Sequence, residues 1–202
     1  MSRSRQHEWV LASSNPGKLT EFRELLADLP IRLTALDAAG GEAPEEDGAS
    51  FVENALIKAR HAAERSGLPA IADDSGLCVD ALGGAPGVHS ARYAGSGASD
   101  RDNIEHLLTE LDTIETDRRQ ASFHCVIVAL ASAADPAPLI ATGRWPGLIL
   151  TGPKGSNGFG YDPVFFDPEL GRTAAELGAE QKNAVSHRGR AATILRDLLR
   201  GE

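Results

Sequence analysis

Two adjacent carboxylates, Asp73 and Asp74, follow the short apolar run 70–72 and precede a serine and a glycine. Neighbouring residues of an extended chain face opposite sides, so we expect the two carboxylates to have different tasks. One can anchor the chain while the other faces a metal ion or a water molecule, because carboxylates serve as metal ligands and as general bases. An Asx-type turn at the end of a strand is the alternative interpretation.

A second candidate segment, residues 13–18, reads Ser-Ser-Asn-Pro-Gly-Lys and leads from an apolar run into a helical pattern. Asn15 is a suitable N-cap, and Pro16 suits the first helical position. The N–H groups and the positive dipole end of a helix N-terminus attract phosphate, and Lys18 adds a positive charge. The segment is not a Walker A loop, which needs an earlier glycine and a hydroxyl residue after the lysine. An ordinary capped helix is the alternative.

Glu45 and Glu46 lie in an acidic loop before a predicted helix. One of them could share a metal ion with the carboxylates at 73–74, because magnesium takes oxygen ligands, few of them from protein. A solvated acidic cluster is the competing explanation. Lys58, two turns into that helix, is either a substrate contact or a solvated lysine.

Residues 155–162 read Gly-Ser-Asn-Gly-Phe-Gly-Tyr-Asp. Glycines let a ligand approach the main chain, and aromatic rings offer a stacking face for a planar base. A flexible hairpin is the alternative interpretation.

Basic and donor groups gather around the start of the last predicted helix: Lys182, Ser186, His187, Arg188 and Arg190. Cations at a helix N-terminus oppose the helix dipole, so this cluster indicates either a functional site or an exposed charged face.

The elements that must position these residues alternate between strands and helices, which predicts one α/β fold without a separable linker. Helices are expected from Pro16, from Phe51 after a Ser50–Glu53 capping box, from Ser99, and from Ser186. Gly67 is expected to close the second of them. On the second of these helices, Asn54 is expected on the polar face. The expected strands are residues 9–12, 31–36, 70–72, 123–131, 139–145, 148–151 and 161–166.

The composition narrows the class of protein further. The chain has 202 residues, 42% of them hydrophobic, and a net charge of −9, which disfavours duplex nucleic acid as a partner. Cys78 and Cys125 lack metal-ligand spacing and are read as reduced, apolar side chains. The N-terminus shows no secretory signal, and no apolar run reaches the roughly 20 residues of a membrane span. A cytoplasmic protein is therefore expected.

Taken in order, these segments form a specific set: Ser-Ser-Asn-Pro-Gly-Lys, Glu-Glu before Ser-Phe-Val-Glu-Asn-Ala, Ala-Asp-Asp-Ser-Gly-Leu, Leu-Gly-Gly-Ala-Pro-Gly-Val-His-Ser-Ala-Arg-Tyr, Gly-Phe-Gly-Tyr-Asp-Pro and Lys-Asn-Ala-Val-Ser-His-Arg-Gly. The set resembles the non-canonical purine nucleoside triphosphate pyrophosphatase family over nearly the whole chain. The resemblance implies an elongated mixed sheet with flanking helices, two lobes around a central cleft, and a homodimer. It also implies magnesium-dependent hydrolysis of the α-β phosphoanhydride of ITP, dITP and XTP, releasing pyrophosphate.

The same resemblance assigns roles to residues. Asp74 would be the general base and a magnesium ligand, with Asp73 in support and Glu45 as the second ligand, unless Glu46 takes that place. Ser14 stands where the family more often has glycine, which puts a close backbone contact there in doubt. The implied substrate contacts are Ser13, Ser14, Asn15, Pro16, Gly17, Lys18, Lys58, Ser75, Phe159, Gly160, Tyr161, Asp162, Lys182, His187 and Arg188.

Two rival functions remain at this point. A pyrophosphatase with another base specificity would have similar segments, and a nucleotide-sensing module would have lost a carboxylate at 74 or at 45–46. Both carboxylate positions are filled. How GTP is excluded is left open by the sequence.

Overall fold

The computed structural model describes residues 7–13, 16–36 and 44–201 of the chain. The strands are β1 (His7–Leu11), β2 (Ile31–Ala35), β3 (Ala70–Val79), β4 (Gln120–Leu130), β5 (Leu139–Ile149), β6 (Phe165–Asp167) and β7 (Arg172–Thr173). The α-helices are α1 (Pro16–Leu25), α2 (Phe51–Ser66), α3 (Asp100–Glu110), α4 (Ala179–Val185) and α5 (His187–Arg200).

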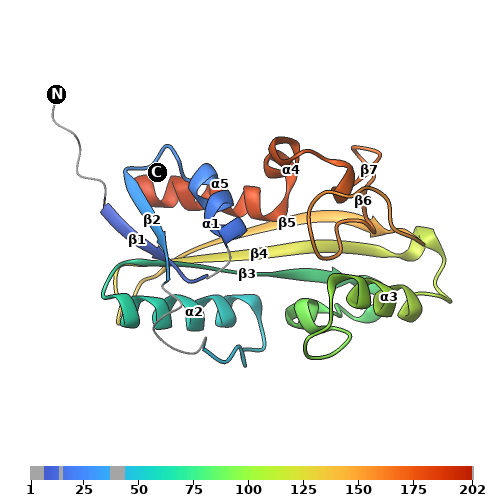
Figure 1. The fold of residues 1–202 in the computed structure, drawn as a ribbon, viewed down its shortest axis with the longest axis horizontal. Helices are drawn as coiled ribbons and strands as arrows, with labels where there is room; N and C mark the ends of the chain where they lie inside the picture. Colours follow the sequence, from blue (N-terminus) through green and yellow to red (C-terminus); the bar gives the residue numbers. More distant parts are fainter. Residues whose placement is uncertain (1–6, 14–15, 37–43, 202) are drawn as a thin grey trace. The chain divides into compact units, whose positions relative to one another are not determined.

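The strands form a mixed sheet in the order β2-β1-β3-β4-β5-β6-β7 (Figure 1). β1 pairs in parallel with both β2 and β3. β6 pairs antiparallel with β5 and with β7. The predicted α/β class with a mixed sheet and flanking helices is confirmed.

Backbone contacts divide the chain into two compact units, and the division falls inside β3, between Asp74 and Ser75. The first unit comprises residues 1–74, 126–142 and 191–202, and the second comprises residues 75–125 and 143–190. Each unit has a hydrophobic core of its own.

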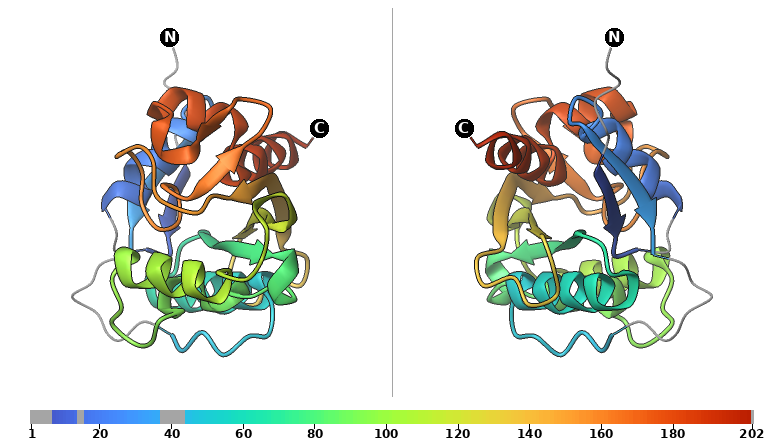
Figure 2. Two further views of the ribbon diagram at one scale, coloured as in Figure 1. Left: turned by 90° about the vertical axis from the view of Figure 1, so that its right-hand side faces the viewer. Right: turned by 90° about the vertical axis from the view of Figure 1, so that its left-hand side faces the viewer.

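The core of the first unit rests on small side chains. Ala55, Ala59 and Ala62 of α2 are fully buried, so the helix can lie close to the beginning of β3 (Figure 1). The predicted caps of α2 are confirmed: the Ser50 side chain accepts from the Glu53 main chain, and Gly67 ends the helix in the left-handed region. Figure 2 shows α1 beside the adjacent strands β1 and β2.

The core of the second unit is aromatic. The Phe123 and Phe165 ring centroids lie 4.5 Å apart, and the Trp145 ring meets Phe165 edge-on at 5.0 Å. The indole N–H of Trp145 donates to the buried Asp167 carboxylate over 2.7 Å, which satisfies both polar groups. α3 follows Ser99, as predicted, and a capping box between Ser99 and Asp102 begins it.

Several predicted boundaries were wrong. The pair Asp73–Asp74 lies inside β3 rather than in a turn after residue 72, because partner side chains satisfy both buried carboxylates. The two strands expected at 139–151 form one strand, and the strand expected from Tyr161 begins at Phe165. None of the described helices is long and apolar enough to cross a membrane.

Candidate active site

The carboxylate of Asp74 lies in the first unit and is held at both oxygens. Lys58 Nζ is 2.8 Å from Asp74 Oδ1, and Asn54 Nδ2 donates to Asp74 Oδ2 over 3.3 Å. The residue is only 8% exposed. Burial raises the pKa of Asp74 above its usual value, and the Lys58 ammonium opposes that rise. Such a carboxylate can accept a proton more readily than an exposed aspartate.

Lys58 links Asp74 to a second carboxylate. Its Nζ atom also lies 3.2 Å from Glu46 Oε2, whereas Glu45 is exposed. Burial tends to lower the pKa of Lys58, but the nearby carboxylates outweigh it and the pKa is raised. A positive centre therefore lies between Asp74 and Glu46, which come from β3 and from the loop before α2.

Asp73 has a different partner, as its opposite orientation in the strand predicts. Asp73 Oδ1 accepts from Lys18 Nζ over 2.9 Å, and Asp73 is 4% exposed. Lys18 lies in the first turn of α1. The ion pair thus ties the start of α1, the candidate phosphate-binding turn, to the strand that carries Asp74.

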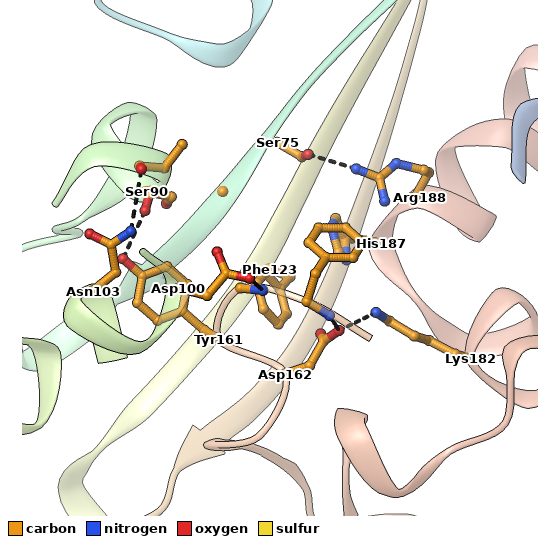
Figure 3. Close-up of a pocket in the computed structure, with 14 residues that line it drawn as sticks. Ser75, Ser90, Asp100, Asn103, Phe123, Tyr161, Asp162, Lys182, His187 and Arg188 are labelled. Carbon is orange, nitrogen blue, oxygen red and sulfur yellow. Dashed lines mark hydrogen bonds and ion pairs between the residues drawn. The ribbon is translucent and has the colours of Figure 1, made fainter. Parts of the chain in front are cut away.

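The second unit contains a cavity of about 140 Å³ (Figure 3). This volume is comparable to the roughly 150 Å³ of an apolar cavity that accepts a benzene ring. Phe159 borders the cavity and is 56% exposed, with Lys182 Nζ 4.9 Å and the Arg188 guanidinium carbon 5.8 Å from its ring centroid. The lining residues are Ser75, Gly76, Ser90, Ala91, Asp100, Asn103, Phe123, Phe159, Gly160, Tyr161, Asp162, Lys182, His187 and Arg188.

The turn that carries Phe159 is fixed by its neighbours. Asp162 Oδ2 accepts from the Phe159 main chain over 2.9 Å and from Lys182 Nζ over 2.5 Å. The Tyr161 hydroxyl donates to the Ser90 carbonyl over 2.8 Å, and Asp100 Oδ2 accepts from Gly160 N over 2.6 Å (Figure 3). Several bonds to different elements therefore hold the aromatic wall of the cavity.

The start of α5 also contributes to the lining. The Arg188 guanidinium donates to Ser75 Oγ over 3.0 Å, and the His187 ring stacks on Phe123 at 4.8 Å between centroids. Ser186 Oγ accepts from Gly189 N, so it caps α5 as predicted. An aromatic cavity with cations along its border suits a planar heterocycle that carries an anionic group.

The family model that matches this chain is that of the Ham1 family, over residues 9–198. The chain belongs to the Ham1 family. The dITP/XTP pyrophosphatases of Yersinia pseudotuberculosis and Photorhabdus laumondii are 56% and 57% identical to it over 191 residues, covering 95% of this chain and 97% of each relative. The structure of a HAM1 protein from Coxiella burnetii superimposes with a TM-score of 0.91 at 52% identity, covering 97% of this chain and 100% of that one. The family expected from the sequence motifs is thereby confirmed.

The structure gathers many of the predicted Ham1 site residues into two groups, one in each unit. Lys18, Lys58, Asp73, Asp74 and Glu46 are joined by ion pairs in the first unit. Ser75, Phe159, Gly160, Tyr161, Asp162, Lys182, His187 and Arg188 line the cavity of the second unit. Ser13 follows β1, and Pro16 and Gly17 begin α1; Ser14, Asn15 and the Pro16 side chain lie outside the described residues.

Some residues around the Ham1 site were missed by sequence reasoning. Asn54 was expected on the polar face of its helix but is fully buried beside Asp74. Asp100 was not singled out in the sequence, although its carboxylate accepts from Gly160 N. Phe123 was expected only as the first residue of a strand, and Ser90 lies in the motif at residues 82–93 but was given no role of its own. Their roles depend on contacts between segments far apart in the chain, which local patterns do not contain.

Proposed function

We propose that this chain hydrolyses ITP, dITP and XTP to the nucleoside monophosphate and pyrophosphate, removing deaminated purines from the nucleotide pool. The observation that carries the proposal is the buried, lysine-paired carboxylate of Asp74, which immediately precedes Ser75 of the cavity lining. Consecutive Cα atoms are about 3.8 Å apart, so chain connectivity alone puts the backbone of this proton acceptor next to a residue of the cavity lining.

In the proposed reaction, Asp74 accepts a proton from a water molecule. The water oxygen forms a bond to the α-phosphorus, and the bond from that phosphorus to the α-β bridging oxygen breaks. Pyrophosphate leaves with the bridging oxygen, and the proton remains on the Asp74 carboxylate until solvent removes it. Lys18, Lys58 or Lys182 would offset the charge that develops on the polyphosphate.

The carboxylates of Asp74 and Glu46 fit a divalent cation, because the Lys58 ammonium already occupies a cationic position between them. Their oxygens suit magnesium, which binds proteins through one or two carboxylates and otherwise uses water and phosphate oxygens. When bound, magnesium supplies positive charge to the phosphates. Sequence matching favoured Glu45 as the second ligand, but we assign it to Glu46 because only Glu46 of the two shares Lys58 with Asp74 among the contacts of the described residues.

Base recognition is assigned to the cavity. Phe159 offers a stacking face, and Arg188 or main-chain N–H groups would donate to the 6-keto oxygen of hypoxanthine or xanthine. Adenine has an amine at that position, so the same donors would face N–H groups. Unpaired buried donors give large rejection ratios.

A cytoplasmic homodimer is part of the proposal, with a small-molecule substrate and no membrane or nucleic acid partner. A pyrophosphatase with a different base preference is the second candidate, since the ion pairs around Asp74 would serve any nucleoside triphosphate.

Product analysis tests the bond that is cleaved. With ITP and labelled water, we expect IMP and pyrophosphate, with the label on the phosphate of IMP. Formation of IDP and inorganic phosphate would exclude attack at the α-phosphorus. Label in the pyrophosphate would place the attack on the β-phosphorus.

A further inference from the structure

The side chain of Asn54 connects two parts of the first unit that carry carboxylates. It is fully buried at the fourth position of α2. Its Oδ1 accepts from Gly48 N over 2.9 Å, and its Nδ2 donates to Asp74 Oδ2 over 3.3 Å. Gly48 lies two residues after Glu46, so one amide joins the strand of Asp74 to the loop of Glu46.

The orientation of this amide is fixed by its partners. A main-chain N–H can only donate, so the Gly48 bond requires the oxygen of Asn54 on that side and leaves the NH₂ group for Asp74. Asn54 and Asp74 are buried and Gly48 is half-buried, and a buried polar group without its partner is costly. The amide therefore restrains both Asp74 and the loop.

Helix capping does not require this side chain. The Ser50 hydroxyl accepts from the Glu53 main chain, and the Asn54 main chain donates to the Ser50 carbonyl over 3.2 Å. These bonds begin α2 without the amide of Asn54. Gly48 lies in the same close contact, because a Cβ atom there would lie 2.6 Å from Asn54 Oδ1 and 2.7 Å from Glu53 Cβ.

We propose that Asn54 is a positioning residue that holds the Asp74 and Glu46 carboxylates in one geometry for a divalent cation. The inference rests on the proposed function for the identity of that site. Groups that hydrogen-bond to metal ligands typically change metal affinity about 10- to 100-fold when they are replaced. A comparable effect is expected at Asn54.

The test is Mn²⁺ binding to the substrate-free enzyme, followed by the loss of the free-ion electron paramagnetic resonance signal, with Mg²⁺ as competitor. Asn54→Leu removes both bonds at similar volume, and Gly48→Ala displaces the amide while keeping it. We expect each variant to bind Mn²⁺ about 10- to 100-fold more weakly than the parent. The double variant should bind Mn²⁺ only slightly more weakly than either single variant, because both substitutions break the same hydrogen-bonded link.

Asn103 provides a matched control. It is a buried asparagine at the fourth position of α3, accepting from Ala94 N over 2.8 Å and donating to the Ala91 carbonyl over 3.2 Å. Asn103→Leu should lose stability but keep the parent's Mn²⁺ affinity. Gly152→Ala is the control for Gly48→Ala, since a Cβ at Gly152 meets nothing within 4 Å.

Unchanged Mn²⁺ affinity in folded Asn54→Leu would overturn the inference and leave Asn54 a packing residue. If Asn54→Leu does not fold, Gly48→Ala decides by the same criterion. The proposed function is judged separately, by pyrophosphate release from ITP by the parent enzyme. The variants could lose Mn²⁺ binding while the parent releases no pyrophosphate from ITP. That result would support the role of Asn54 and reject the proposed hydrolysis.

Discussion

Asp74 and Lys58 form a buried pair in which each group alters the proton affinity of the other. Burial disfavours the charged carboxylate and raises its pKa, while the ammonium favours the charged form. The folded protein thus binds a proton at Asp74 more tightly than the unfolded chain does. The ionised carboxylate therefore costs the fold some stability at neutral pH, a cost that decreases as the pH falls through the raised pKa and is gone below the ordinary pKa of the unfolded chain.

Asp74→Asn should lower the rate of pyrophosphate release by at least about 10³-fold, because the amide cannot accept the proton of the attacking water. The neutral isostere removes a buried charge, so we expect the thermal midpoint to stay within about 3 °C of the parent, or about 1 kcal/mol. A steady-state assay and a thermal scan measure the two effects. The exposed Asp112→Asn serves as control, and unfolding of Asp74→Asn would support a purely structural role.

Lys58→Met should shift the acid limb of kcat/KM to higher pH. Loss of the positive charge raises the pKa of Asp74 further, so less of the base is ionised at any given pH below neutrality. The rate at the optimum should also fall about 10²- to 10³-fold, as when one charge-stabilising group is removed. Lys58→Arg, which keeps the charge, should retain the parent's acid limb. If the acid limb does not move in Lys58→Met, the charge of Lys58 does not control the pKa of the catalytic base.

At the scale of elements, the helix starts were predictable and the polar part of β3 was not. Ser50, Ser99 and Gly67 predict helix ends, because they cap helices through hydrogen bonds to residues nearby in the sequence. Aspartates disfavour strands, so β3 was expected to end at residue 72. It continues because Lys18 and Lys58, from α1 and α2, satisfy the two carboxylates. The polar-face prediction for Asn54 failed because the loop at Gly48 covers that position.

Gly158→Ala should weaken substrate binding through the turn of Phe159. Gly158 has a φ of +77°, and a Cβ there would overlap the Asp162 carboxylate that fixes the turn. We expect the KM for ITP to rise about 10-fold, because the turn no longer positions Phe159. The substitution also adds roughly 1–2 kcal/mol of backbone strain, which lowers stability.

Gly171→Ala is the matched control for this prediction. Gly171 has a φ of +66° but open space at its Cβ position, so it isolates the backbone strain. It should lower the thermal midpoint without changing KM. Equal KM values in the two variants would show that the turn does not position the base.

At the scale of the whole molecule, the sequence predicted the family and the α/β class because its motifs span nearly the whole chain. Residue types in those motifs also predicted the carboxylates and cations that the structure groups around Asp74 and around the cavity. The pairing of Lys18 with Asp73, the contact of Asp100 with Gly160, and the preference for Glu46 depend on three-dimensional contacts. Local sequence patterns do not predict these contacts, because the residues lie far apart in the chain.

The central claim is that this molecule hydrolyses deaminated purine nucleoside triphosphates and rejects the normal ones. The most direct measurement is pyrophosphate release from ITP, XTP, GTP, ATP and dTTP, each with magnesium, compared as kcat/KM. We predict that kcat/KM for ITP and XTP exceeds that for ATP by at least about 10²-fold, as expected for a site built to donate to the substrate's keto group. Guanine shares that keto group, so we expect the fit of its 2-amino group to lower kcat/KM for GTP. Equal hydrolysis of ATP or GTP, or no hydrolysis of ITP and XTP, would contradict the account.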